Sequence, residues 1–199
     1  TQEELESGRK FSKEARGEGE DKTTTTTTTG DTSGDGSGVD VGVYTPILDL
    51  IAKYESGSGG YESMYPGTTL PGATGMTIAE VARKATGAVG MYQNMPRFLN
   101  ARAKAVGLDP NKALYDEENQ RKIAVYLIEE GQAGVTPQML KDNPDEAMIR
   151  LAKVWAAIPV PKAMRGHSKQ LTKGESYYAG DGANKAHITP EMMYGAMKS

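Results

Sequence analysis

The first 40 residues differ so sharply from the rest of the chain that they limit what can fold. They contain only four apolar side chains, and they carry 10 acidic against 5 basic residues. A segment with so little apolar surface cannot offset the conformational entropy that is lost when its backbone is ordered. Within it, Thr23–Thr29 form an unbroken threonine run that Gly-, Asp- and Ser-rich sequence follows. We therefore predict a disordered, low-complexity polar tail and linker over residues 1–40 and one folded domain over residues 41–199.

Composition excludes several classes of protein. The chain has no cysteine, which rules out disulfides, Cys-ligated zinc, iron–sulfur clusters and thiol catalysis. Its two histidines, His167 and His187, are too few for a His-rich metal site. No apolar run approaches the roughly 20 residues that span a bilayer. Residues 41–199 are nearly neutral, whereas nucleic-acid-binding proteins are usually strongly basic. We expect no metal, no cofactor, no membrane span and no nucleic-acid partner.

Helix-start signals recur along residues 41–199. Thr45, Thr136, Asn143 and Thr189 each precede a proline, the arrangement of an N-cap residue followed by Pro at the first helical position. Apolar residues recur at helical spacing after these starts. The predicted helices span residues 46–55, 78–86, 96–106, 116–130, 137–141, 144–157 and 190–197.

Other signals mark the helix ends and the fold class. Thr77 and Glu80 are spaced as a capping box, in which each side chain satisfies a backbone N–H of the first turn. Gly87, Gly107 and Gly131 stand where C-terminal caps belong. Alternating apolar runs are scarce, and the Gly-, Ser-, Pro- and Thr-rich stretch after the first helix has room for one small hairpin. These signals predict a mainly α fold of the α+β type, with the hairpin within residues 56–76.

Glu55 continues the apolar stripe of the first predicted helix. It follows Ile47 and Ile51 at steps of four residues, so it lies on the same face, at the C-terminal end of the helix. The negative end of the helix dipole and the apolar neighbours both favour the protonated carboxyl. A carboxyl that is protonated near neutral pH can donate a proton to a leaving oxygen, as the acid of a glycosidase does. Taken alone, such a position is more often a Glu at a frayed helix end that reaches water.

Four motifs follow one another in an order that resembles one enzyme superfamily. They are a Glu-Ser-Gly segment with its Gly-rich loop, a Gly-x-Tyr-Gln turn, a Trp-Ala-Ala-Ile-Pro segment and a Ser-Tyr-Tyr loop. This order resembles the soluble lytic transglycosylase and phage lysozyme-like superfamily, and within it the lambda-lysozyme type of phage muramidase. The resemblance spans residues 45–198 and leaves the polar tail uncovered. The motifs lie at residues 55–61, 90–93, 155–159 and 176–178.

The resemblance implies a lysozyme-like fold that cleaves the β-1,4 bond between MurNAc and GlcNAc in bacterial peptidoglycan, with Glu55 as the acid. A retaining or inverting glycosidase needs a second carboxylate. Asp49, Glu62, Glu80 and Asp181 are candidates, but none stands in a comparable motif. A lytic transglycosylase needs none, because the 6-hydroxyl of the sugar attacks the anomeric carbon. We therefore expect this reaction, with 1,6-anhydro products, in preference to hydrolysis.

Candidate substrate-binding residues follow from the resemblance and from what glycan recognition needs. Gly90 lets the backbone approach a sugar closely, and Gln93 offers both a donor and an acceptor. Tyrosines offer flat apolar faces with polar tips, although a half-buried core position is an equal alternative for each of them. Ser56 either hydrogen-bonds Glu55 or caps the helix. The candidates are Ser56, Tyr61, Gly90, Tyr92, Gln93, Tyr177 and Tyr178.

The polar tail indicates where such an enzyme works, because a tether is useful only when it joins two working parts. We expect a phage virion protein that acts on the bacterial cell wall. Its partners are then peptidoglycan glycan strands and, through the N-terminal segment, other phage tail or baseplate proteins. Two alternatives stay open. One is a non-enzymatic structural or wall-binding tail or baseplate component with a lysozyme-like fold, and the other is a free endolysin that acts as a hydrolase.

Overall fold

The computed structural model describes residues 41–180 and 184–199, and it is mainly helical, as the sequence predicts. The predicted tail over residues 1–40 and the candidate Asp181 lie outside the described residues. The helices are α2 (Thr45–Glu55), α3 (Ile78–Lys84), α4 (Pro96–Ala105), α5 (Glu117–Tyr126), α6 (Pro137–Asp142), α7 (Pro144–Ala152) and α8 (Pro190–Lys198).

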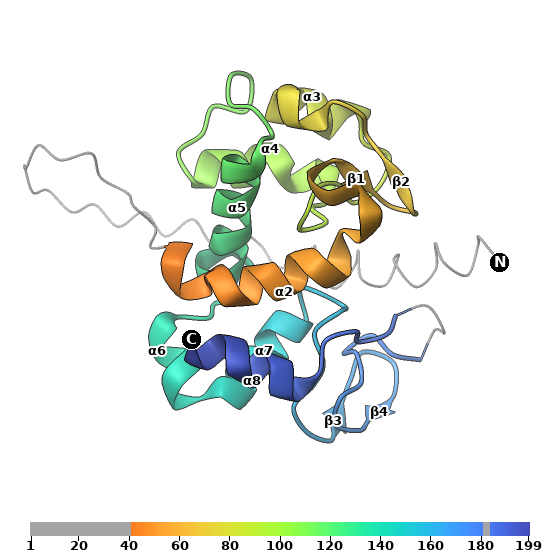
Figure 1. Cartoon of the computed structure of the whole chain (residues 1–199), viewed down its shortest axis with the longest axis vertical. Helices are drawn as coiled ribbons and strands as arrows, with labels where there is room; N and C mark the ends of the chain where they lie inside the picture. The colour runs from red at the N-terminus through yellow and green to blue at the C-terminus, as the bar shows by residue number, and fades with distance from the viewer. Residues whose placement is uncertain (1–40, 181–183) are drawn as a thin grey trace, which may run out of the picture.

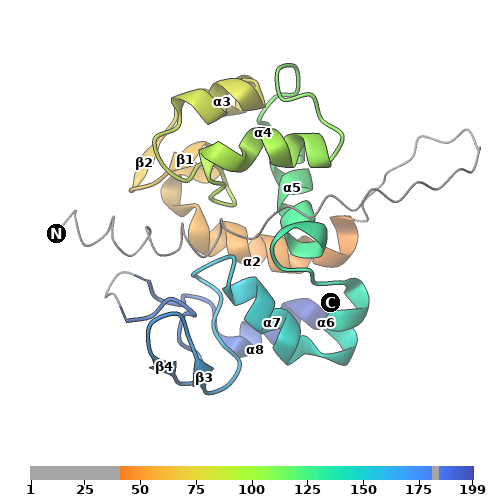
Figure 2. The ribbon, with the colours of Figure 1, turned by 180° about the vertical axis from the view of Figure 1, so that it is seen from behind.

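Helix α2 runs between two groups of elements, which both views of the ribbon separate clearly (Figures 1 and 2). Helices α3, α4 and α5 form one group, together with a hairpin of β1 (Ser63–Met64) and β2 (Thr68–Thr69). Helices α6, α7 and α8 form the other, together with a hairpin of β3 (Met164–Arg165) and β4 (Gln170–Leu171). Glu55, the last residue of α2, therefore stands at the end of the helix that both groups share.

The buried apolar residues form two clusters. The first cluster joins α2 and the end of α5 to α7 and α8, and it holds the chain's single tryptophan, Trp155, which is 2% exposed. The second lies under α3, α4 and the first turns of α5. Helix α2 contributes Ile47, Leu48 and Ile51 to the first cluster, and all three are fully buried. The apolar stripe that leads to Glu55 in the sequence is thus the buried face of α2.

Three of the four predicted Pro-containing N-caps are confirmed. The side chains of Thr136, Asn143 and Thr189 each accept a hydrogen bond from the backbone N–H three residues further on. Thr45 was predicted wrongly as a cap. A 3-10 turn leads directly into α2, so Tyr44 occupies the cap position and no side chain caps the helix. At each confirmed cap, the hydrogen bond joins residues only three positions apart in the sequence.

The predicted capping box at the start of α3 is present, and both of its hydrogen bonds are formed. Among the glycines, Gly107 follows α4 with φ +76°, as a C-terminal cap should. Gly87 and Gly131 were predicted wrongly as caps. Gly87 lies against the backbone of the first hairpin turn, where a Cβ would come within 2.1 Å of a carbonyl oxygen. Gly131 lies inside a π-helical turn over Leu127–Gly131.

The predicted helix over residues 144–157 is too long, because α7 ends at Ala152. The next residues form turns with local hydrogen bonds, and long-range hydrogen bonds hold the chain further on. The backbone N–H of Val160 donates to the carbonyl oxygen of Glu175 at 2.8 Å, and the N–H of His187 donates to that of Ala157 at 3.2 Å. The segment that follows α7 is therefore a series of turns, which backbone hydrogen bonds tie to the chain around Glu175 and His187.

The small hairpin predicted within residues 56–76 is confirmed. Ser63 pairs with Thr69 and Met64 with Thr68 in antiparallel register. The backbone N–H of Gly90 also donates to the carbonyl oxygen of Ser63 at 2.7 Å, which fixes the Gly-x-Tyr-Gln turn beside β1. The β3–β4 hairpin was not predicted, because strands of two residues are too short to give an alternating pattern.

Candidate functional site

The side chain of Glu55 reaches across from the end of α2 to the segment that follows α7. The backbone N–H of Ala157 donates to its Oε1 atom at 2.9 Å. The side chain is half-buried, and Oε2 has no hydrogen-bond partner among the described residues. Because an N–H group can only donate, Oε1 must act as the acceptor.

The Gly-x-Tyr-Gln turn is closed by a backbone pair between Val89 and Asn94, with both N–H···O distances at 2.9 Å. Two of its residues have left-handed backbone, Gly90 with φ +82° and Gln93 with φ +50°. At Gly90 a Cβ would lie 2.4 Å from an oxygen atom of Gln120, so a side chain has no room there. Glycine at position 90 thus serves close packing against α5.

Gln93 is buried within the turn and uses both of its amide hydrogens internally. Its Nε2 atom donates to the carbonyl oxygen of Gly90 at 2.9 Å and to Oγ of Ser63 at 3.3 Å. Its Oε1 atom has no partner among the described residues. The sequence suggested a donor and an acceptor for a ligand, whereas the structure leaves only the acceptor available.

Three of the four motifs meet at the segment that follows α7. The indole Nε1 of Trp155 donates to the carbonyl oxygen of Tyr92 at 3.2 Å, in the middle of the turn. Two residues later, the backbone N–H of Ala157 holds the carboxylate of Glu55. One short segment therefore fixes both the candidate acid and the candidate binding turn, although the three motifs lie far apart in the sequence.

The structure places two of the candidate tyrosines in the core. Tyr92 is 1% exposed and Tyr178 is 3% exposed, so neither ring offers the flat face that the sequence suggested for sugar stacking. The ring of Tyr92 belongs to the first cluster, while the ring of Tyr178 packs against Tyr177 and its hydroxyl donates to the carbonyl oxygen of Lys153. For these two residues the core alternative is the correct one.

The other two candidate tyrosines, Tyr61 and Tyr177, are half-buried and keep part of their surface exposed. Burial, followed by a hydrogen bond to the carboxylate of Glu117, raises the pKa of the Tyr61 hydroxyl, so this group stays neutral and donates. The ring of Tyr177 stands edge-on to Tyr178, and the ammonium group of Lys153 lies 5.6 Å from its centroid.

Ser56 caps the end of α2. Its hydroxyl donates to the carbonyl oxygen of Ala52 at 2.6 Å, and the residue is 5% exposed. No hydrogen bond to Glu55 forms. Of the two roles left open by the sequence, the structure therefore contains the capping one, which fixes the backbone immediately after the candidate acid.

The candidates for a second carboxylate that the structure describes have other partners. Asp49 forms an exposed ion pair with Arg121 at 3.4 Å. Glu80 is committed to the capping box, whose backbone N–H and hydroxyl hold the pKa of its carboxyl below the usual value. Glu62 accepts a hydrogen bond at 3.2 Å from a threonine hydroxyl of a neighbouring turn. Asp181 lies outside the described residues.

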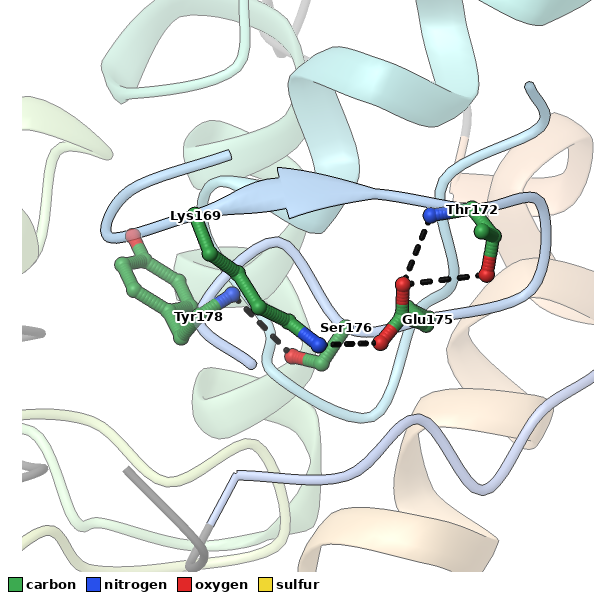
Figure 3. A network of polar contacts seen from close by, with 5 residues as sticks. All are labelled: Lys169, Thr172, Glu175, Ser176 and Tyr178. Carbon is green, nitrogen blue, oxygen red and sulfur yellow. Dashed lines mark hydrogen bonds and ion pairs between the residues drawn. The ribbon is translucent and has the colours of Figure 1, made fainter. Parts of the chain in front are cut away.

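The loop that carries the Tyr-Tyr pair is held by a compact polar network (Figure 3). The carboxylate of Glu175 accepts from Nζ of Lys169 at 2.6 Å, and from the N–H and hydroxyl of Thr172 at 2.6 and 3.0 Å. These donors, the ammonium group first, lower the pKa of Glu175 to about 2. The Thr-x-x-Glu spacing of a capping box is thus used here outside a helix, a signal that the sequence analysis overlooked.

Sequence reasoning also missed Gln120, a fully buried residue of α5. A signal was present, because Gln120 precedes Ile123, Ala124 and Leu127 at steps of three, four and seven residues. Helical spacing from apolar residues placed Glu55 on a buried helix face, and the same spacing places Gln120 on a buried face of α5. The N–H of Ala157, in contrast, is a backbone group and has no sequence signal.

No protein-family model, curated protein or solved structure matches this chain. The similarity to the lysozyme-like superfamily therefore rests on the four motifs and stays a prediction. In residues 41–180 and 184–199, no helix is both long and apolar enough to cross a lipid bilayer. Across the same ranges, titratable side chains form no group of three that could hold a metal ion.

Proposed function

We propose that residues 41–199 cleave the β-1,4 bond between MurNAc and GlcNAc in bacterial peptidoglycan as a lytic transglycosylase, with Glu55 as the acid. One observation carries the proposal. The segment after α7 holds Oε1 of Glu55 through the N–H of Ala157 and holds the Gly-x-Tyr-Gln turn through Trp155. A candidate acid and a candidate sugar-binding turn are thereby fixed to one support, which is what positioning for catalysis requires.

The contacts of Glu55 suit an acid that later acts as a base. Oε1 accepts from an N–H group, so in this proposal Oε2 carries the proton that is transferred to the glycosidic oxygen. As the bond from the anomeric carbon to that oxygen breaks, the GlcNAc leaves with the proton. Oε2 then accepts the proton of the MurNAc 6-hydroxyl, while the oxygen of that hydroxyl bonds to the anomeric carbon. No water is consumed, and a 1,6-anhydro sugar forms.

The surrounding residues divide the work of holding the glycan. Oε1 of Gln93 is an acceptor that suits an N–H or O–H group of the sugar, since its amide hydrogens are occupied. Tyr61 and Tyr177 supply partly exposed rings for the amphipathic sugar faces. We assign binding roles to these three residues and a supporting role to the buried rings of Tyr92 and Tyr178.

The low-complexity segment over residues 1–40 supports a delivery role for this domain. Its polar Thr- and Gly-rich composition predicts a linker, which would let a wall-cleaving domain remain attached to a particle and still reach its substrate. We propose that the protein belongs to a phage virion, that it acts on the bacterial cell wall, and that its N-terminal segment binds other tail or baseplate proteins.

A second candidate function is a structural or wall-binding one without catalysis. The observation that favours it is the same hydrogen bond, because the contact between Glu55 and Ala157 also ties α2 to a segment 102 residues away. A carboxylate retained only for this tie would need its acceptor oxygen and not its proton. The two functions therefore make opposite demands on position 55.

Glu55→Gln in the full chain separates the two functions. The amide oxygen of Gln still accepts from the N–H of Ala157, but the side chain has no acidic proton to give. We expect turbidity clearing of purified peptidoglycan to fall at least about 100-fold, the usual contribution of a general acid. The thermal midpoint should stay close to that of the wild type. Glu130→Gln, at an exposed position of the π-helical turn, is the matched control and should stay active.

The products decide the reaction class. Mass spectrometry of the released muropeptides should find 1,6-anhydro ends. If only reducing ends are found, the protein is a hydrolase, as expected for the alternative of a free endolysin. An active Glu55→Gln protein would refute Glu55 as the acid. A wild-type protein that binds glycan strands without cleaving them would establish the non-enzymatic alternative.

A further inference from the structure

Gln120 of α5 is a buried amide whose hydrogen-bonding capacity is used between three different segments. Its Oε1 atom accepts from the backbone N–H of Met91 at 2.9 Å. Its Nε2 atom donates to the carbonyl oxygen of Tyr61 at 3.0 Å and to that of Tyr115 at 2.9 Å. The residue is fully buried, so no water competes for these bonds. Each bond left unmade would strand a buried polar group.

The three contacts fix the orientation of the amide as well as its place. Two carbonyl oxygens face Nε2 and one N–H faces Oε1, so a flipped amide would set donor against donor and acceptor against acceptor. The oxygen also lies 2.4 Å from where a Cβ on Gly90 would be. Gln120 therefore has one arrangement in which all its partners are satisfied, and that arrangement requires the turn to lie where it does.

Two of the segments that Gln120 joins are those to which the proposed function assigns sugar binding. Met91 is in the Gly-x-Tyr-Gln turn, and Tyr61 ends the Gly-rich loop that follows Glu55. The neighbouring residue of the turn, Tyr92, is held from the other side by the indole of Trp155. The turn is thus held at two consecutive residues, by α5 through Met91 and by the segment after α7 through Tyr92.

We infer that Gln120 is a positioning residue, which sets the Gly-x-Tyr-Gln turn and the Tyr61 loop in register with each other for binding the glycan. This inference rests on the proposed function. Gln120 does not touch substrate in this role. It acts through the backbone of Met91 and Tyr61, so its loss displaces the acceptor of Gln93 and the ring of Tyr61 relative to Glu55.

The test is Gln120→Met in the full chain, which keeps the side-chain length and removes all three hydrogen bonds. We expect kcat/KM for peptidoglycan cleavage to fall about 100-fold, the size of effect that a shift of about 1 Å in a binding group produces. Much of the loss should appear as a raised KM. In the inactive Glu55→Gln background, affinity for tetra-N-acetylchitotetraose, followed by Trp155 fluorescence, should fall at least about 10-fold with Gln120→Met.

Leu140→Ala is the control for a general loss of stability. Leu140 is a buried residue of α6 in the first apolar cluster, and both views show α6 on the side where α2 begins, whereas Glu55 ends α2 (Figures 1 and 2). Removing its side chain destabilises the protein without touching either segment. At a temperature where both variants are folded, Leu140→Ala should keep wild-type kcat/KM and affinity. Equal losses in the two variants would overturn the positioning role.

Hydrogen exchange supplies a readout that does not depend on activity. The amide of Met91 should exchange faster in Gln120→Met than in the wild type, while amides of α8 should not change. If Gln120→Met does not fold, Gln120→Glu replaces it. A protonated Glu can accept from Met91 and donate to one carbonyl oxygen, so its kcat/KM relative to the wild type should be higher at pH 5 than at pH 8.

The outcomes separate the two claims. A wild-type protein that cleaves no glycan overturns the proposed function and this inference with it. A wild-type protein that cleaves, together with a folded Gln120→Met variant of unchanged kcat/KM and unchanged affinity for the tetrasaccharide, overturns this inference alone. A Gln120→Glu variant with wild-type kcat/KM at both pH values does the same.

Discussion

Gly90→Ala is the substitution whose cost can be derived most directly from the structure. The residue has φ +82°, a left-handed conformation that L side chains rarely adopt. A Cβ at this position would lie 2.4 Å from Oε1 of Gln120 and 2.5 Å from the hydroxyl oxygen of Tyr115. Both atoms belong to buried side chains that are held by other hydrogen bonds, so neither can move away freely.

The expected magnitude is a sum of two effects. Left-handed backbone costs a residue with a Cβ about 1–2 kcal/mol. Forcing an extra carbon into a packed site costs about 1–3 kcal/mol more. The free energy of unfolding should therefore fall by about 2–5 kcal/mol, a large part of the 5–15 kcal/mol typical of a domain. For a chain of this length that corresponds to a fall in the thermal midpoint on the order of 10 °C.

The control is Gly107→Ala, at the end of α4. Gly107 has φ +76°, and a Cβ there would meet nothing within 4 Å. It should incur only the backbone cost of about 1–2 kcal/mol. Urea denaturation followed by circular dichroism would measure both variants. If the two lose equal stability, the contact between the turn and Gln120 is not tight, and the reasoning about the turn fails.

Two further predictions follow from single contacts. In Glu175→Gln the carboxylate that binds Lys169 and Thr172 is lost. Because the pKa of Glu175 is lowered to about 2 when folded, the stabilisation is present above the unfolded value of about 4.3 and disappears as the pH falls towards 2. The difference in thermal midpoint between wild type and variant should be constant above pH 5 and shrink below it, and a pH-independent difference would contradict this. Trp155→Phe leaves the carbonyl oxygen of Tyr92 buried without its donor, which costs about 1–3 kcal/mol, and adds a cavity. The urea midpoint, followed by circular dichroism because Trp155 is the single tryptophan, should fall, and an unchanged midpoint would refute the anchor.

Local rules were sufficient for three of the four Pro-containing helix starts. The caps at Thr136, Asn143 and Thr189 bond to N–H groups three residues away, so their partners are already near in the unfolded chain. The same rules failed at Thr45, because a preceding turn moved the cap position, and at Ala152, where the helix gives way to turns inside the predicted helix. A sequence pattern of a few residues does not show when the structure of the neighbouring chain overrides a local helix signal.

In the candidate site, too, local spacing predicted some features and not others. The apolar spacing of Ile47 and Ile51 placed Glu55 on a buried helix face, and the structure confirms that face. The sequence could not tell whether each tyrosine faces solvent, and Tyr92 and Tyr178 are in the core. A tyrosine suits either environment, so the residue type alone does not predict whether its ring is buried or exposed.

By itself, the sequence determined a mainly helical fold with one small hairpin in residues 56–76, and it brought Glu55 to the end of an amphipathic helix. The tertiary structure alone decided what touches Glu55, which is a backbone N–H 102 residues away. It also decided that Gln120 joins the turn to the Tyr61 loop across 29 and 59 residues. The reason is physical. Helix periodicity and capping are set by neighbours along the chain, whereas buried hydrogen bonds form only after packing has excluded water and brought distant segments together.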